Sequence, residues 1–60
     1  MNENIPQDPF LLLSYVNLKL RDYYPSLDEM CAALNLDKAA VTKKLSGIDY
    51  AYDPDSNQFV

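Results

Sequence analysis

Apolar residues follow a helical spacing in three successive segments of the chain and an alternating spacing in the last segment. The first helix opens at Asp8 and Pro9, because a carboxylate can accept free amide protons and proline suits the first helical position. It continues to about Asp22. The apolar stripe predicted to face the core consists of Leu13, Val16, Leu20 and Tyr24, flanked by Leu12 and Tyr23.

This first helix also carries a second apolar face. Leu11, Tyr15 and Leu18 lie nearly opposite the core stripe when residues are placed about 100° apart around the helix axis. A helix that is apolar on two faces is typically covered on both. The second face therefore needs a cover, supplied either by the chain itself or by another molecule.

Two covers for this face are possible. The C-terminal hairpin can lie on it through Tyr50, Tyr52 or Phe59. Alternatively, another protein molecule covers it, since monomers rarely expose contiguous apolar patches of several hundred Å². We favour association, most simply as a homodimer, because the hairpin is small. The predicted protein interface is then Leu11, Tyr15 and Leu18, with Asn17 and Arg21 at its rim.

The middle of the chain predicts two further helices joined by a tight turn. Ser26 and Glu29 form an S-x-x-E capping box at the start of the second helix. Asn35, which tolerates the left-handed conformation, ends it. Asp37 caps the third helix and Gly47 stops it. The inner positions of these two helices are Leu27, Met30, Cys31, Leu34, Val41 and Leu45.

The last residues predict a two-stranded hairpin. Ile48, Tyr50 and Tyr52 alternate with polar or small residues, and residues 54–57 have the composition of a turn. A four-residue loop places Phe59 opposite Tyr52 as an aromatic cross-strand pair. The predicted fold class is mainly α with a small β-hairpin: a three-helix, winged helix-turn-helix-like domain over residues 8–60, after a flexible segment at residues 1–7.

A helix-turn-helix arrangement raises the possibility of DNA binding by the third helix. The small–turn–apolar spacing typical of such units is met by Cys31, Asn35 and Val41, but any two helices crossing steeply over one core need it. The outward residues that would contact nucleic acid are Lys38, Thr42, Lys43 and Lys44. Lysines near a helix C-terminus are also stabilised by the helix dipole, so their presence does not require a nucleic-acid ligand. We prefer this solvated-face interpretation and keep a DNA-binding regulator as the alternative.

The composition of the chain argues against several kinds of binding site and catalytic group. The chain has 60 residues with nine acids, five bases and a net charge of −4, a balance that disfavours general affinity for nucleic acid. A single cysteine and no histidine leave neither an intrachain disulfide nor a zinc site. Cys31 lies on an apolar stripe with no histidine to activate it, so we expect a core residue rather than a nucleophile. We expect no enzyme, catalytic residues, cofactor, metal or small-molecule substrate.

The acidic turn raises the possibility of a calcium site, and the hydropathy pattern bears on membrane insertion and secretion. Asp53, Asp55 and Asn57 match the first ligand positions of a calcium loop, but Gln58 stands where the required glycine belongs, so a hairpin turn explains them. The longest apolar run covers residues 10–13, far short of the roughly 20 residues that span a bilayer. The N-terminus lacks the pattern of a secretory signal. We therefore expect a cytoplasmic protein without membrane contact.

Four segments together resemble a known family: residues 8–22 (DPFLLLSYVNLKLRD), 24–28 (YPSLD), 48–53 (IDYAYD) and 57–59 (NQF). They resemble a family of small bacterial proteins catalogued as a domain of unknown function, the one numbered four thousand two hundred and fifty. The resemblance covers nearly the whole chain. It implies a bacterial, cytoplasmic, stand-alone domain and brings no catalytic residues. The family pattern would have Ile-Gly-Tyr where this chain has Ile48, Asp49 and Tyr50.

Overall fold

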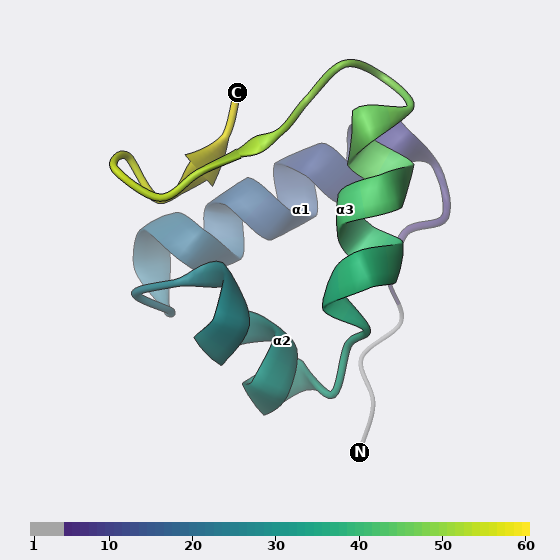
Figure 1. The fold of residues 1–60 in the computed structure, drawn as a ribbon. Coiled ribbons are helices and arrows are strands. Elements are labelled where there is room, and N and C mark those ends of the chain that lie inside the picture. Colours follow the sequence, from purple (N-terminus) through teal and green to yellow (C-terminus); the bar gives the residue numbers. More distant parts are fainter. Residues whose placement is uncertain (1–4) are drawn as a thin grey trace.

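A computed structural model of the chain describes residues 5–60 (Figure 1). Within this part, three helices precede a two-stranded antiparallel sheet. The elements are α1 (Pro9–Asp22), α2 (Leu27–Leu34), α3 (Lys38–Ser46), β1 (Tyr52–Asp53) and β2 (Gln58–Phe59). The predicted fold class, mainly α with a small β-hairpin, is confirmed. A three-residue turn joins α2 to α3, and this arrangement is compatible with a winged helix-turn-helix.

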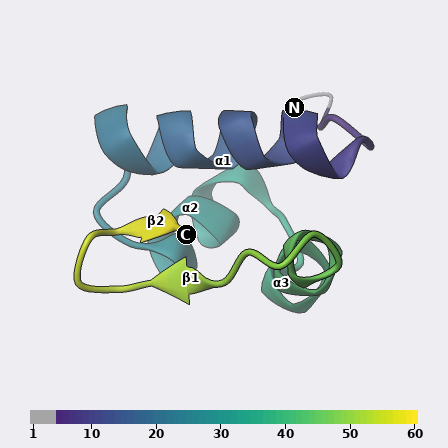
Figure 2. The ribbon, with the colours of Figure 1, turned by 90° about the horizontal axis from the view of Figure 1, so that it is seen from above.

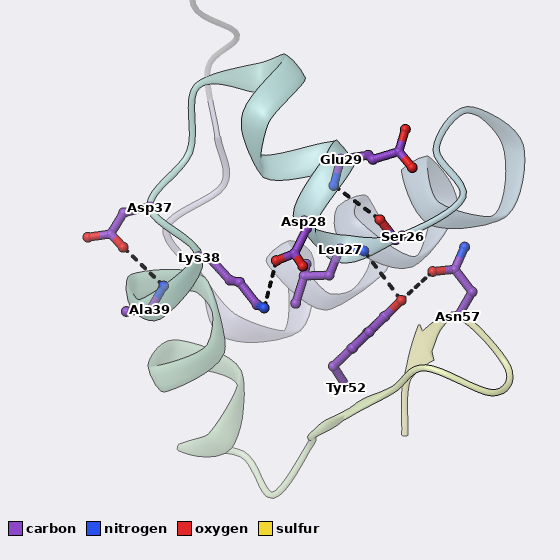
Figure 3. A network of polar contacts seen from close by, with 9 residues as sticks. All are labelled: Ser26, Leu27, Asp28, Glu29, Asp37, Lys38, Ala39, Tyr52 and Asn57. Atoms are coloured by element: carbon purple, nitrogen blue, oxygen red, sulfur yellow. Dashed lines mark hydrogen bonds and ion pairs between the residues drawn. The ribbon is translucent and has the colours of Figure 1, made fainter.

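Each helix begins at the side chain that the sequence predicted as its cap. Asp8 Oδ1 accepts hydrogen bonds from the amides of Phe10 and Leu11 at 2.8 and 3.3 Å. Ser26 Oγ accepts the amide of Glu29 at 3.2 Å, and Asp37 Oδ1 accepts the amide of Ala39 at 3.0 Å (Figure 3). These bonds satisfy amides that have no partner within the helix itself.

Helices α2 and α3 are each followed by a left-handed residue, which at α3 comes two positions after the C-cap glycine. Asn35 ends α2 with φ 57°, as expected. Gly47 is the C-cap of α3, so the helix ends at the predicted residue, but its φ of −64° is right-handed. Asp49 adopts the left-handed conformation instead, with φ 67°. The amide of Tyr50 then bonds the carbonyl of Leu45 at 3.0 Å, and that of Asp49 bonds Ser46 at 3.0 Å, which together form a Schellman motif.

The core gathers one stripe from each helix and one residue from the hairpin. Its buried members are Leu12, Val16, Leu20, Leu27, Met30, Cys31, Val41, Leu45 and Phe59. Two details of the predicted α1 stripe are wrong. Leu12 is buried whereas Leu13 is only partly covered, and Tyr23 is 67% exposed. The buried stripe of α1 is therefore centred on Val16, because α2 and α3 both pack on that side.

Helix α1 forms one layer, and α2, α3 and the hairpin form the other (Figure 2). Figure 2 shows α2, α3 and the hairpin together on one side of α1. The hairpin pairs Tyr52 with Phe59 in the predicted register, and the two rings lie 5.6 Å apart between centroids. The backbone pair of Ala51 and Val60 extends this ladder through two hydrogen bonds of 2.9 and 3.0 Å.

Two asparagines fasten the hairpin to α1. The side chain of Asn17 donates to the carbonyl of Phe59 at 3.2 Å and accepts its amide at 2.8 Å. Asn57 Nδ2 donates to the carbonyls of Leu20 and Tyr24, each at 3.0 Å. The hairpin is thus held along its length against one flank of α1.

The segment before α1 contacts the domain within its described part. Residues 1–4 of the predicted flexible segment lie outside the described residues. Ile5 and Pro6 are half-buried, and Ile5 packs against the core. The Lys44 ammonium group donates to the backbone carbonyl of Gln7 at 3.1 Å and to its side-chain oxygen at 3.2 Å.

Candidate interaction surface

The face of α1 that points away from the core carries several exposed apolar side chains. We call it the outer face and define it by Phe10, Leu11, Ser14, Tyr15 and Leu18. Phe10 is 63% exposed, Leu11 62% and Leu18 45%, whereas Tyr15 is half-buried. No other described element lies over this side of the helix (Figure 2).

The hairpin does not cover the outer face, so that alternative from the sequence is wrong. It lies instead on the flank of α1 that holds Asn17, because both polar groups of that side chain bond to Phe59. Phe59 itself is buried in the core between the layers. Among the described residues, the exposed apolar groups on the outer face therefore have no intramolecular cover.

The polar residues expected at the rim of this face differ in their position. Both polar groups of the Asn17 side chain bond to the backbone of Phe59 in β2. Arg21 is exposed and bonds the neighbouring carboxylate of Asp22 through Nε and Nη2, at 3.0 and 3.1 Å. The hydrogen bond from Arg21 is the main reason that the pKa of Asp22 is lowered.

A second flank of α1 carries a lysine between two aromatic rings. The Lys19 ammonium group lies 5.4 Å from the ring centroid of Tyr15 and 5.0 Å from that of Tyr23. These distances are within the range of cation–π attraction. Tyr23, which was predicted to flank the core stripe, therefore lies on the surface, one helical turn after Lys19 and in contact with its ammonium group.

A groove of about 750 Å³, lined in part by Asn17, separates the outer face from the hairpin turn. Ser14, Leu18 and Arg21 line it from α1, and Ser56 and Gln58 line it from the turn. The groove is open to solvent, and its lining contains both polar and apolar side chains. It therefore marks the edge of the outer face and does not form an enclosed ligand site.

The lysines of α3, predicted as possible nucleic-acid contacts, are largely engaged within the chain. Lys38 forms an ion pair with Asp28 of α2, with 2.6 Å between Nζ and Oδ1 (Figure 3). This carboxylate raises the pKa of Lys38, chiefly through the hydrogen bond. Lys44 bonds Gln7, and Thr42 is half-buried. Lys43 is exposed, and its ammonium group makes no hydrogen bond or ion pair with any residue in the described range.

In the acidic turn of the hairpin, the side chain of Asp53 forms hydrogen bonds within the turn itself. Asp53 accepts the amide of Asp55 at 3.0 Å and the hydroxyl of Ser56 at 2.9 Å. Asn57, the third residue of the calcium-like pattern, points to α1 instead of joining the two aspartates. Across residues 5–60, no three cysteine or acidic side chains come close enough to hold a metal ion.

Residues 6–59 match the family described as Domain of unknown function (DUF4250). The chain belongs to this family. The resemblance seen in the four sequence segments is thereby confirmed. No curated protein and no solved structure matches the chain. For this DUF4250 domain, a function has to be argued from its surfaces.

Three residues of this DUF4250 domain have roles that the sequence analysis missed. Phe10 belongs to the outer face, and its spacing of four from Ser14 and eight from Leu18 was the available signal. Asn17 and Asn57 make contacts 33 to 42 positions away, for which the local sequence holds no signal. Cys31 lies in the core as expected, and burial raises the pKa of its thiol.

No helix in the described part of this domain has both the length and the apolar character needed to cross a bilayer.

Proposed function

We propose that this protein is a non-enzymatic interaction module that self-associates through the outer face of α1. The supporting observation is the exposure of Phe10, Leu11 and Leu18 on a single helix face. Exposed apolar groups that are contiguous on one face mark association sites more often than isolated ones do.

The size of the domain supports a second copy as the partner. Nine side chains are buried in the core, and the described residues form no disulfide or metal cluster. Small domains with such cores usually gain stability from oligomerisation or another staple. A two-fold dimer needs only one surface patch that matches itself. The outer face offers such a patch, because its apolar residues are spread along both halves of α1.

Sedimentation velocity over a micromolar to millimolar concentration range tests the proposal. We expect the unmodified protein to form dimers, and Leu11→Glu and Leu18→Glu to remain monomeric at concentrations where it associates. Both leucines are largely exposed in the monomer, so these changes should leave its helix content intact. Ala33→Glu provides the matched control, since it places the same charge at an exposed position on α2.

Two outcomes contradict self-association. One is a protein that remains monomeric throughout the concentration range. The other is a dimer that neither leucine substitution weakens, because the contact would then lie on a different surface.

DNA binding through α3 is the alternative function, and the observation in its favour is that Lys38 and Lys43 are both exposed on this helix. Two of the three lysines already have partners within the chain, and the net charge of −4 repels phosphates. A gel-shift assay with random duplex DNA at low salt tests it. A shift that weakens as salt rises and is reduced by Lys43→Ala would support DNA binding, and no shift at low salt would remove it.

A further inference from the structure

We propose that two copies of this chain associate with their α1 helices antiparallel, about a two-fold axis between Ser14 and Tyr15. This inference rests on the proposed self-association and adds its geometry. In this arrangement, Leu11 of each copy contacts Leu18 of the second copy. Ser14 and Tyr15 each lie beside their own counterparts.

The apolar pattern fits this register. Leu11 and Leu18 are the exposed leucines of the outer face and are seven positions apart, which is two helical turns or about 10 Å. An antiparallel pair centred between them places Leu11 of each copy against Leu18 of the second copy. The two-fold symmetry produces this contact twice, so all four leucines are covered. The small Ser14 at the centre lets the two helices approach closely on one side of the axis.

The charged ends and the dipole of α1 favour the antiparallel direction. Asp8 is the acidic residue at the N-terminal end, and its two capping bonds both use Oδ1. Lys19 and Arg21 are the basic residues of the last turn, and the charge of Arg21 is offset by its ion pair with Asp22, so Lys19 supplies the net positive charge of this end. An antiparallel pair brings the acidic end of each helix beside the basic end of the other and also opposes the two helix dipoles. A parallel pair would place like charges together, and complementary charges set the orientation of an interface more than its affinity.

The layered fold leaves room for such a contact. All the other described elements lie on the core side of α1, so none stands between two helices that meet through their outer faces (Figure 2). The exposed ring of Phe10 lies on the same side of the axis as Ser14, at the edge of the contact. The contact can therefore extend over the whole of α1, about 21 Å for its 14 residues.

Disulfide cross-linking tests the register. Single cysteines are introduced as Leu11→Cys, Ser14→Cys and Leu18→Cys, and the unmodified chain, whose Cys31 is buried, is the control. We expect Ser14→Cys to form a covalent dimer on mild oxidation. Leu11→Cys or Leu18→Cys alone should give about tenfold less, because the two copies of each lie about 10 Å apart along the axis, too far for a disulfide. An equal mixture of Leu11→Cys and Leu18→Cys should cross-link in about half of its dimers, because random pairing makes half of them mixed and only these place one cysteine opposite the other.

The possible outcomes separate this register from self-association as such. If Leu11→Cys alone cross-links as well as Ser14→Cys does, the helices are parallel and the register is wrong. If sedimentation shows a dimer but neither Ser14→Cys nor the mixture cross-links, α1 is not at the centre of the contact, and the register fails. If sedimentation shows a monomer, the register and the proposed function fail together. Circular dichroism of each variant confirms that the helices are retained.

Discussion

At the scale of a single residue, the Asn57 side chain links the hairpin to the end of α1 directly and to the start of α2 through Tyr52. Its amide donates to the carbonyl of Leu20 in α1 and to that of Tyr24 just after the helix, and its Oδ1 accepts the Tyr52 hydroxyl at 2.6 Å. That hydroxyl in turn accepts the amide of Leu27 at 3.3 Å, in the first turn of α2 (Figure 3). Helix ends carry such unpaired groups, and a partly buried one costs stability if left unsatisfied. Asn57 also adopts φ 55°.

Replacing Asn57 by alanine should therefore destabilise the fold strongly. Asn57→Ala removes three hydrogen bonds and leaves a left-handed alanine, a loss of about 3 kcal/mol in the free energy of unfolding. Asn35→Ala is the matched control, because Asn35 has φ 57° and is exposed. It should lose only about 1 kcal/mol. Urea denaturation measures both, and equal losses would show that the hydrogen bonds of Asn57 contribute little.

At the scale of the element, the end of α3 shows how a departure from the family pattern is accommodated. The resemblance leads us to expect glycine at position 49, and the structure has a left-handed aspartate there. Glycine adopts this conformation without the strain that a Cβ causes, and aspartate tolerates it better than most residues do. The Schellman motif of α3 thus forms despite the substitution, at some cost in stability.

Asp49→Gly should accordingly stabilise the protein. We expect a gain of about 0.5 kcal/mol in the free energy of unfolding, because relief of strain exceeds the extra flexibility of the unfolded chain. Asp49→Ala should have the opposite effect, since alanine lacks the local hydrogen bonding that helps aspartate at positive φ. Thermal denaturation compares them. A loss of stability in Asp49→Gly would mean that the aspartate side chain makes a contribution of its own at this turn.

Local signals explain which elements were predictable. The caps at Asp8, Ser26 and Asp37 act within three residues, and the loop length alone fixed Tyr52 opposite Phe59. The choice between Leu12 and Leu13 as the buried residue depends on where the neighbouring helices lie, and spacing along one helix cannot reveal that. The same holds for the contacts made by the α3 lysines, whose partners are 10 and 37 positions away.

At the scale of the whole molecule, the domain keeps its buried residues on one side of α1 and leaves apolar groups on the other. The sequence indicated an apolar second face on α1, but it could not tell whether the hairpin covers it. That depended on the two bonds between Asn17 and Phe59, which join residues 42 positions apart. The position of one asparagine therefore determines which face of α1 remains available to a partner.

If the outer face joins two copies, stability should depend on protein concentration. Ligands or partners that bind only the folded state raise the melting temperature by mass action. Unfolding enthalpies typical of domains of this size predict a rise in Tm of about 5 °C for each tenfold increase in concentration, within the range where dimers form. Leu11→Glu should melt at a temperature independent of concentration, whereas Ala33→Glu should behave as the unmodified protein does. Differential scanning calorimetry at several concentrations provides the measurement, and a constant Tm for the unmodified protein would contradict the expectation.

The bonds between Asn17 and the backbone of Phe59 also bear on aggregation. A strand at the edge of a sheet offers unpaired amides and carbonyls that can recruit strands from other chains into fibrils. On β2, the Asn17 side chain occupies these groups at Phe59 much as a neighbouring strand would, so that edge is closed to a growing fibril. The remaining edge belongs to β1, which is two residues long and carries an aspartate. Loss of the Asn17 amide would thus expose a template for amyloid-like stacking.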